Sequence, residues 1–216
     1  MPDRTQVTEV DHPLASRVYR RRARKAEYAG VRGHRERLLA GLAGTVVEIG
    51  AGSGINFLLY PPRVETVIAI EPEPSMRQAA EAAAREADLP VCVLAGAAEA
   101  LPLADAEADA GVASLVLCSV EDLAQAVAEL FRVIRPSGEL RFYEHVVSVR
   151  PSVARLQRAA DATVWPRVSG GCHLGRDTRA AIEGGGFQVE DCQRFAFSAH
   201  AFEPPKSFIL GRAHRP

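Results

Sequence analysis

The stretch Val46-Val47-Glu48-Ile49-Gly50-Ala51-Gly52-Ser53-Gly54 decides the fold of this chain. Its first half is a mostly apolar run, as expected for a strand that is covered on both faces. Its second half has a glycine at every second position. Glycine adopts positive φ and lacks a Cβ, so the backbone can turn tightly from the strand into a helix and approach a ligand closely. We therefore expect Gly50, Gly52 and Gly54 to form a shelf for a ligand, with a tight turn that binds nothing as the alternative.

The rest of the chain continues the alternation of short β-branched runs with alanine-rich stretches at helical spacing. This pattern predicts an α/β fold, in which a seven-stranded, mostly parallel sheet carries helices on both faces. The last two strands should form a hairpin at the sheet edge. The expected strands are Thr45–Gly50, Thr66–Glu71, Val91–Leu94, Ala110–Leu117, Glu139–Val147, Phe187–Phe197 and Ser207–Arg212, and the expected helices are Pro74–Ala87, Asp122–Ile134, Ser152–Thr163 and Asp177–Glu183.

Composition limits the classes of protein. A chain of 216 residues that is 47% hydrophobic can bury one substantial core, so one compact domain is expected. The net charge of −1 provides no overall field that would attract nucleic acid or an acidic membrane. The cysteines form no Cys-x-x-Cys pair, and residues 1–15 contain no long apolar run. Both features predict a soluble, unprocessed cytoplasmic protein.

The glycine spacing and two acidic residues indicate the kind of ligand. A dinucleotide site uses G-x-G-x-x-G, whereas here the third glycine comes one residue early and Ile55 takes its place. Glu71 ends the second strand about twenty residues later, where a carboxylate can accept both hydroxyls of a ribose. A solvated strand-end carboxylate is the alternative for Glu71. Glu48 should accept hydrogen bonds from loop amides or from a ligand's ammonium group, because an unpaired buried carboxylate is costly.

Two further segments are expected at the same edge of the sheet. Gly96–Pro102 follows the third strand, and Ser114–Ser119 ends the fourth. Ligands of open parallel sheets bind beyond the carboxyl ends of the strands. Together with the glycine loop and Glu71, these segments predict one pocket, although Gly96–Pro102 taken alone is equally compatible with an ordinary turn.

With these motifs, residues 46–145 resemble the class I S-adenosylmethionine-dependent methyltransferases of the type 11 methyltransferase domain. The resemblance implies a Rossmann-like class I methyltransferase fold and S-adenosyl-L-methionine as the cofactor. It assigns Ala97-Ala98-Glu99 to the turn that contacts adenine. Ala97 stands where the family often has an aspartate, so a backbone contact is expected there. The implied cofactor-binding residues are Glu48, Gly50, Gly52, Gly54, Asn56, Glu71, Pro72, Met76, Ala97, Ala98 and Leu115.

Other motifs give a closer resemblance, to the thiol S-methyltransferases of the methyltransferase-like seven group. The resemblance suggests a thiol as the small-molecule acceptor, with a phenol or quinol as the alternative. Those relatives carry an apolar N-terminal anchor, whereas residues 17–25 of this chain are rich in arginine. No stable membrane association is therefore expected. The matching motifs are Leu115-Val116-Leu117-Cys118-Ser119-Val120, Glu144-His145-Val146, Gly171-Cys172-His173-Leu174, Asn56-Phe57 and Tyr60-Pro61-Pro62.

The chemistry implied by the resemblance needs little acid–base help. Methyl transfer from a sulfonium is a direct displacement, so alignment of the reacting atoms and exclusion of water matter most. A thiol, with a pKa of about 8.5, already ionises in part near neutrality, whereas a phenol or alcohol needs a base. His145, at the end of the fifth strand, is the candidate base, and a hydrogen-bonded structural histidine is the alternative. Glu144 is expected to be a structural partner.

The acceptor side is expected to come from three parts of the chain. Residues 1–44 should form cap helices over the cofactor site of a single domain at 45–216, with Tyr19 or Tyr28 facing the pocket. Trp165 is either an apolar wall of that pocket or an ordinary packed tryptophan. Cys172 and His173 lie in a glycine-rich loop that can fold over the acceptor. No metal is predicted, because zinc needs about four ligands and no spacing supplies them.

Three classes of protein stay open at this point: the methyltransferase, a cofactor-binding interaction module without catalysis, and a nicotinamide-dependent oxidoreductase. The glycine spacing disfavours the last. A nucleic-acid patch formed by the N-terminal arginines is disfavoured, because few aromatic residues lie between them. The expected partner is therefore a small-molecule acceptor, with no nucleic acid, and the expected assembly is a monomer or homodimer.

Overall fold

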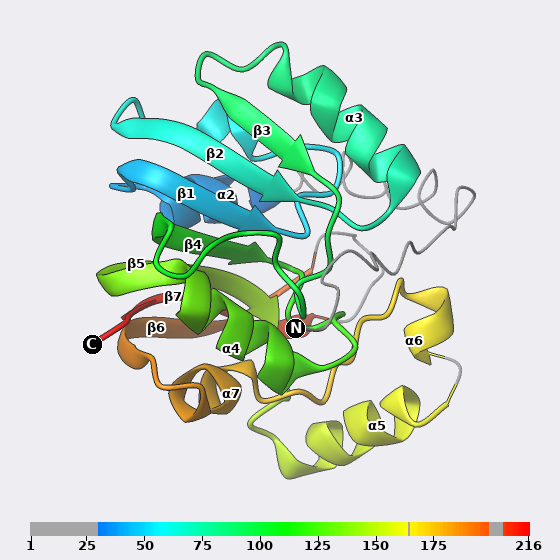
Figure 1. The fold of residues 1–216 in the computed structure, drawn as a ribbon. Coiled ribbons are helices and arrows are strands. Elements are labelled where there is room, and N and C mark those ends of the chain that lie inside the picture. The colour runs from blue at the N-terminus through cyan, green and yellow to red at the C-terminus, as the bar shows by residue number, and fades with distance from the viewer. Residues whose placement is uncertain (1–29, 164, 199–204) are drawn as a thin grey trace, which may run out of the picture.

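A computed structural model describes residues 30–163, 165–198 and 205–216 of the chain (Figure 1). Seven strands form one sheet in the order β3-β2-β1-β4-β5-β7-β6. β7 runs antiparallel to both of its neighbours, and the other pairs are parallel. The predicted mostly parallel sheet is therefore confirmed. The strands are β1 (Gly44–Ile49), β2 (Val64–Ile70), β3 (Val91–Leu94), β4 (Ala108–Ser114), β5 (Ile134–His145), β6 (Gln188–Phe197) and β7 (Lys206–His214).

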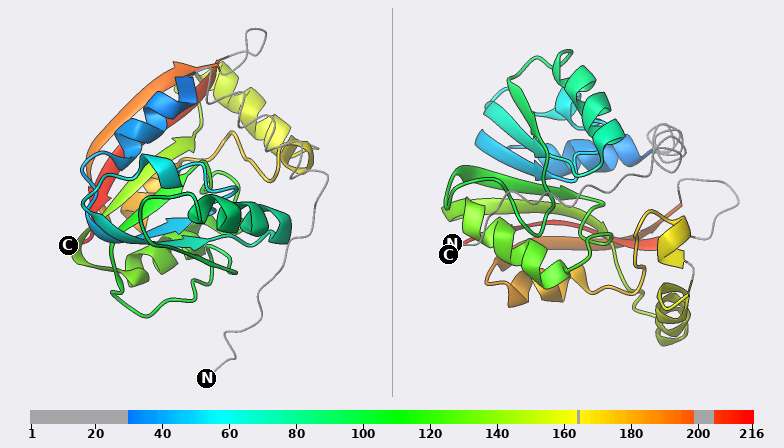
Figure 2. Two further views of the ribbon diagram at one scale, coloured as in Figure 1. Left: turned by 90° about the horizontal axis from the view of Figure 1, so that it is seen from above. Right: turned by 45° about the vertical axis from the view of Figure 1, so that its right-hand side comes forward.

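Helices cover both faces of the sheet, as expected (Figure 2). One apolar cluster joins β1 and β2 to α2 and α3, and a second joins the sheet to α4 and α7. Three helices begin at an acidic N-cap that accepts a backbone N–H of the first turn. The helical segments are α2 (Arg32–Leu39), η2 (Phe57–Leu59), α3 (Pro74–Ala84), α4 (Leu123–Val133), α5 (Pro151–Asp161), α6 (Trp165–Val168) and α7 (Thr178–Gly184).

The predicted helix directly after the glycine loop is wrong. Residues 52–56 form turns, and only the short 3₁₀ segment η2 follows them. Tyr60 follows this segment and precedes Pro61 and Pro62, and a proline disfavours helical backbone in the residue before it, so Tyr60 is extended. The chain therefore returns to the sheet at Val64 without a crossover helix between β1 and β2.

Two strand boundaries differ from the prediction by more than two residues. β4 ends at Ser114 rather than Leu117, because Leu115 has a left-handed φ of 60°. β5 begins at Ile134, directly after α4, rather than at Glu139. Ile134 pairs with Ala108, and a register shift follows before the ladder resumes at Glu139. Residues 135–138 have no partner in β4, and Ser137 has a left-handed φ of 61°, so the segment in which Pro136 and Gly138 favoured a turn bulges out of the ladder.

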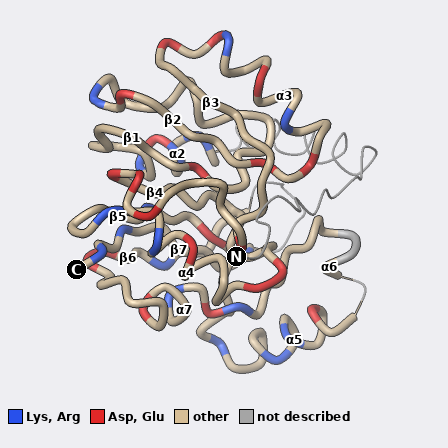
Figure 3. Tube along the Cα trace, in the orientation of Figure 1, with Lys and Arg blue, Asp and Glu red and all other residues tan. Residues whose placement is uncertain are grey.

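Charges of both signs are interspersed along the described chain (Figure 3). The arginine-rich residues 17–25 and the predicted helix around them lie outside the described residues. Of the predicted N-terminal cap, the structure describes α2, which packs against β5, β7 and η2. Each helix in the described part of the chain is too short or too polar to cross a membrane.

Candidate active site

The carboxyl ends of the parallel strands bring the predicted site residues to one edge of the sheet. The glycine loop follows β1, Glu71 follows β2, and Leu115 follows β4. His145 is the last residue of β5. This is the edge at which ligands of open parallel sheets bind, and α6 lies beyond it in Figure 1.

The three glycines of the loop have different roles. All have positive φ, at 59°, 59° and 75° for Gly50, Gly52 and Gly54. A Cβ on Gly50 would lie 2.4 Å from Val116 Cγ2, and one on Gly54 would lie 2.6 Å from the Phe57 ring. These two glycines therefore allow close packing within the protein. Among the described residues, a Cβ on Gly52 would meet only the Met76 methyl group, at 3.8 Å, so these residues leave open space above the loop at Gly52.

Glu71 links the end of β2 to this loop. Its Oε2 accepts the Gly52 N–H at 2.7 Å, and its Oε1 accepts the Glu73 N–H at 3.0 Å. Burial raises the pKa of Glu71, while these two backbone donors act in the opposite direction. An ionised carboxylate offers about four acceptor positions. Glu71 therefore retains acceptor capacity for hydroxyl groups beside the open space at Gly52.

Glu48 lies at the centre of a buried polar network beneath the loop. It accepts hydrogen bonds from Asn56 Nδ2 at 2.7 Å and Tyr60 Oη at 2.8 Å. Arg35 Nη1 donates to Asn56 Oδ1 at 3.0 Å and to Ser114 Oγ at 2.9 Å. Burial raises the pKa of Glu48 to about 7, although the bonds from Tyr60 and Asn56 oppose the rise. The donors to Glu48 are thus side chains rather than backbone amides of the loop.

Sequence reasoning missed Arg35, although the sequence contains a signal for it. Val31, Arg35, Leu38 and Leu39 have the spacing of one helix face, and all four are buried. A charged residue on an otherwise apolar helix face is rarely buried without a partner. The spacing therefore indicates a buried network that includes Arg35.

The other predicted cofactor residues surround the loop to different degrees. Met76 is buried beside Gly52, and the carbonyl of Pro72 accepts a bond from Arg77 Nη1 at 3.2 Å. Leu115 N–H donates to the Tyr143 carbonyl at 2.7 Å. In the turn after β3, Ala98 packs into the core, whereas Ala97 is half-buried.

Glu144 fixes the loop that follows β4. Its side chain is fully buried and accepts the N–H groups of Val116, Leu117 and Cys118 at 3.0, 3.0 and 3.1 Å. These N–H groups do not continue the ladder between β4 and β5, which explains why β4 stops early. Glu144 is therefore the structural partner that the sequence predicted.

His145 points toward two cysteines from other parts of the chain. Its Nδ1 lies 3.3 Å from Cys172 Sγ and 4.0 Å from Cys118 Sγ. Cys118 is buried, and its hydrogen bond with Cys172, together with burial, raises its pKa to about 12. Cys172 was expected near the acceptor, but no spacing in the sequence indicates its proximity to Cys118 and His145, because only the fold brings the three residues together.

The remaining acceptor residues have separate surroundings. Trp165 begins α6, and the Lys206 ammonium lies 5.9 Å from the centroid of its ring. His173 N–H donates to the Cys118 carbonyl at 2.8 Å, so its backbone adjoins the cysteine cluster. Tyr19 and Tyr28 lie outside the described residues.

Comparison with known proteins agrees with this geometry. Residues 47–142 match the family described as methyltransferase domain. The thiol S-methyltransferase TMT1B of Rattus norvegicus is 34% identical over 64% of this chain and 58% of its own length. The thiol S-methyltransferase TMT1A of Homo sapiens is 30% identical over 79% of this chain and 68% of its own length. An S-adenosylmethionine-dependent methyltransferase structure from Thermotoga maritima superposes with a TM-score of 0.67 at 21% identity, covering 93% of this chain and 96% of that one.

The chain belongs to the class I S-adenosylmethionine-dependent methyltransferases. Within that class, it is similar to proteins named as thiol S-methyltransferases, although the matched segment spans only 58% of the rat relative. The family uses S-adenosylmethionine, and the site residues fit that cofactor. Gly52 leaves a space that a Cβ would fill, and Glu71 presents a carboxylate beside it.

Proposed function

We propose that this protein transfers the methyl group of S-adenosylmethionine to the sulfur of a small-molecule thiol. The observation that carries the proposal is the position of the histidine and cysteine cluster. His145 ends β5 at the same sheet edge as the glycine loop, and its Nδ1 faces two cysteine sulfurs. The similarity to thiol S-methyltransferases supports the same acceptor class.

In this proposal the cofactor lies along the glycine loop. Glu71 accepts bonds from the ribose hydroxyls, Gly52 and Met76 leave room for the nucleoside, and Ala97 contributes backbone groups to the adenine edge. The network of Glu48, Asn56 and Arg35 holds the underside of the loop. When bound, the cofactor supplies an electrophilic methyl group. The protein aligns the acceptor and excludes water, and we propose residues 1–44 as the cap on this site.

In our proposal the loop between α6 and α7 forms part of an acceptor pocket that faces the cofactor. Gly171 N–H donates to the Pro166 carbonyl at 2.7 Å, which holds the turn that carries Cys172. In our proposal Cys172, His173 and Trp165 line the acceptor side. The near-neutral composition and the cysteine usage support a cytoplasmic enzyme that works as a monomer or homodimer.

Calorimetry with the purified chain tests the cofactor part of this proposal. We expect binding of S-adenosylmethionine and S-adenosylhomocysteine, and no binding of NAD or NADP. The physical reason is that the third glycine of the loop does not stand where a dinucleotide site needs it to place a pyrophosphate on a helix N-terminus. In addition, no α-helix directly follows the loop. Tight NAD binding without any response to S-adenosylmethionine would instead identify an oxidoreductase.

A turnover screen tests the acceptor. Labelled S-adenosylmethionine is incubated with matched thiol, phenol and quinol compounds, and methylated products are detected by mass spectrometry. We expect thioether products to dominate. Methylation of phenols or quinols alone would contradict the thiol assignment, and cofactor binding without turnover across the whole screen would favour a non-catalytic interaction module.

A further inference from the structure

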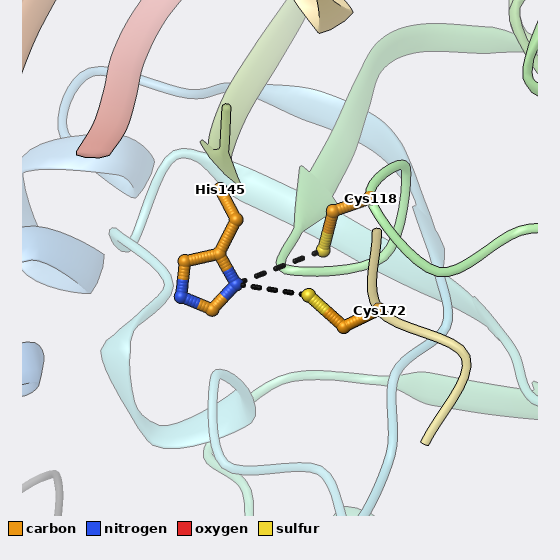
Figure 4. Close-up of side chains that lie close together, drawn as sticks. All are labelled: Cys118, His145 and Cys172. Atoms are coloured by element: carbon orange, nitrogen blue, oxygen red, sulfur yellow. Dashed lines mark hydrogen bonds between the residues drawn. The ribbon is translucent and has the colours of Figure 1, made fainter. Parts of the chain in front are cut away.

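Three side chains with metal-binding atoms converge at the proposed acceptor side of the site. Figure 4 shows Cys118 from the loop after β4, His145 from the end of β5 and Cys172 from the loop after α6, with their ends directed toward one another. One ligand atom from each residue lies within 4.8 Å of the other two. No other such group is found in the described part of the chain.

We propose that Cys118, His145 and Cys172 bind one Zn²⁺ ion and leave its fourth coordination position open for the acceptor sulfur. The metal site stands on the geometry of the three residues alone. The identity of the fourth ligand rests on the proposed thiol methyltransferase function.

The two distances from the imidazole nitrogen to the sulfur atoms are close to those of a tetrahedral zinc site. Zinc bonds of about 2.3 Å to sulfur and 2.0–2.1 Å to nitrogen place the two atoms about 3.6 Å apart at the tetrahedral angle. The Nδ1 atom of His145 lies 3.3 Å from Cys172 Sγ and 4.0 Å from Cys118 Sγ, values on either side of that spacing. Shifts of a few tenths of an ångström would therefore bring both nitrogen–sulfur pairs to the zinc-bound spacing, and the two sulfur atoms already lie within 4.8 Å of each other.

The donor set also selects the metal. Two thiolates and one neutral imidazole are soft to intermediate ligands, which favour Zn²⁺ over the oxygen-seeking Mg²⁺ and Ca²⁺. Two thiolate charges balance the charge of the ion. A site with three protein ligands is typical of zinc that binds a substrate or water, because structural zinc sites are closed by a fourth residue.

The loop that carries Cys118 is held in place before any metal binds. The buried Glu144 carboxylate accepts the N–H groups of Val116, Leu117 and Cys118 itself. Arg176 Nη1 donates to the Leu117 carbonyl at 2.8 Å. Such outer contacts orient the ligands and commonly control metal affinity.

The loop that carries Cys172 is docked on the first loop. His173 N–H donates to the Cys118 carbonyl at 2.8 Å. Gly171 has φ of 85°, and a Cβ on it would lie 2.9 Å from the Ser119 carbonyl oxygen. The close approach of these two backbones therefore sets the separation of the two sulfur atoms.

The imidazole is oriented by the sheet. His145 pairs with Phe208 of β7, and the two ring centroids lie 4.4 Å apart. His145 is half-buried, whereas both cysteines are buried. The cluster therefore has its more accessible side at the imidazole, where an acceptor molecule can approach.

A zinc ion here would activate the acceptor and position it. On coordination the acceptor thiol releases its proton to solvent and stays bound as a thiolate. The acceptor sulfur then forms a bond to the methyl carbon while the carbon–sulfonium bond breaks, and that electron pair leaves with the cofactor sulfur. The thioether product is neutral and a weaker ligand than the thiolate, so it can dissociate.

Val116, two residues before Cys118, contacts the glycine loop at Gly50, which places the cluster next to the cofactor region.

Direct metal binding tests the site without any activity assay. The full chain is purified with a reductant, stripped with a chelator and titrated with Co²⁺ and then Zn²⁺. We expect one metal per chain and an intense thiolate-to-cobalt charge-transfer absorption, which Zn²⁺ then abolishes. Absence of that absorption in the reduced, folded chain would overturn the proposal, as would an obligate Cys118–Cys172 disulfide that reforms in the presence of the metal.

Variants assign the ligands. Cys118→Ser and Cys172→Ser should each lose the cobalt absorption partly or fully and weaken zinc binding by about tenfold or more. Cys92→Ser is the matched control, since Cys92 is exposed on β3, and it should bind like the wild type. Thermal unfolding of each variant verifies that it folds. Equal zinc affinity in folded Cys118→Ser and in the wild type would contradict the assignment.

The outcomes separate this inference from the proposed function. Zinc binding without methylation of any thiol would support the metal site and contradict the thiol assignment. Thiol methylation that is unchanged by complete metal removal would support the function and overturn the zinc site. In that case His145 would act as a base or as a structural residue.

Discussion

The backbone N–H of Gly52 donates a hydrogen bond of 2.7 Å to Oε2 of Glu71. This bond ties the loop after β1 to the end of β2, so the two parts of the proposed cofactor site are held in register. A second bond, from the Glu73 N–H to Oε1 of Glu71, fixes the carboxylate from the side of α3. The carboxylate is thereby oriented before a ligand arrives.

Replacement of Glu71 by alanine should weaken cofactor binding by about 1.5–3 kcal/mol, the range for hydrogen bonds to a charged group. Calorimetry with S-adenosylhomocysteine measures the change. Glu65→Ala is the control, because Glu65 is an exposed carboxylate of β2. An unchanged dissociation constant in the folded Glu71→Ala variant would remove Glu71 from the site.

Gly52→Ala should lose more cofactor affinity than stability. The left-handed φ of 59° costs an alanine about 1–2 kcal/mol, and its methyl group has room in the free protein. The same methyl group would occupy the proposed ligand space, so affinity should fall by about tenfold or more.

The matched control for this variant is Gly41→Ala. Gly41 has φ of 81° and no atom closer than 3.9 Å to an added Cβ, and it lies at the opposite end of β1. Both variants should lower the melting temperature to a similar extent. If both also bind S-adenosylhomocysteine like the wild type, the space at Gly52 is not a ligand site.

The buried Glu48 should make stability depend on pH. Its pKa is raised to about 7 in the folded protein, above its ordinary value of 4.5, so the folded state binds the proton more tightly. The stabilisation of the folded state by protonation of Glu48 is complete below pH 4.5 and is lost as the pH rises through about 7. Glu48→Gln carries no such titration.

The measurement is the free energy of unfolding of both proteins at pH 5 and pH 8. From pH 5 to pH 8, the free energy of unfolding of the wild type should fall by up to about 3 kcal/mol relative to that of Glu48→Gln. This follows because one pKa unit corresponds to about 1.4 kcal/mol. This comparison cancels any difference between the two proteins that does not depend on pH. A gap that stays constant would show that Glu48 is ionised throughout.

Glu144→Gln should destabilise the loop after β4. Three buried N–H groups share the carboxylate, and the single amide oxygen of glutamine cannot satisfy all of them. Oε1 accepts two of these bonds and Oε2 the third, so glutamine leaves at least one donor unsatisfied, and that donor predicts a loss of roughly 1–3 kcal/mol.

Denaturant unfolding tests this loss against Glu139→Gln. Glu139 lies on the same strand in a partly buried ion pair with Arg141, and glutamine there keeps a hydrogen-bond acceptor, so this replacement should cost at most about 1 kcal/mol. Equal losses in the two variants would show that Glu144 is not the anchor of the loop.

Features set by neighbouring residues could be predicted from the sequence. The glycine loop, the acidic end of β2 and the helix starts at Pro74 and Asp122 each depend on a short stretch of chain. Turn formation and capping are local, so residue type and spacing are sufficient to indicate them. The parallel strands follow from the repeated apolar runs in the same way.

Some boundaries could not be predicted, because distant groups compete for the same backbone atoms. β4 stops at Ser114 since the carboxylate of Glu144 takes the N–H groups that follow, and the apolar run gives no sign of this competition. The network around Arg35 is an intermediate case. The helical spacing indicates its buried position, but its partners Asn56 and Ser114 come from other elements.

By itself, the sequence indicated the strands, the glycine loop and, through the family resemblance, the class of cofactor, because residue type and spacing within short stretches of chain carry these signals. Only the tertiary structure decided that Cys118, His145 and Cys172 meet. Cys118 and Cys172 each lie 27 residues from His145, and none of the three has a spacing typical of a metal site. Their separation is set by the pairing of β5 with β7 and by the docking of one loop on another. Such contacts depend on how whole elements pack, which local residue patterns do not encode.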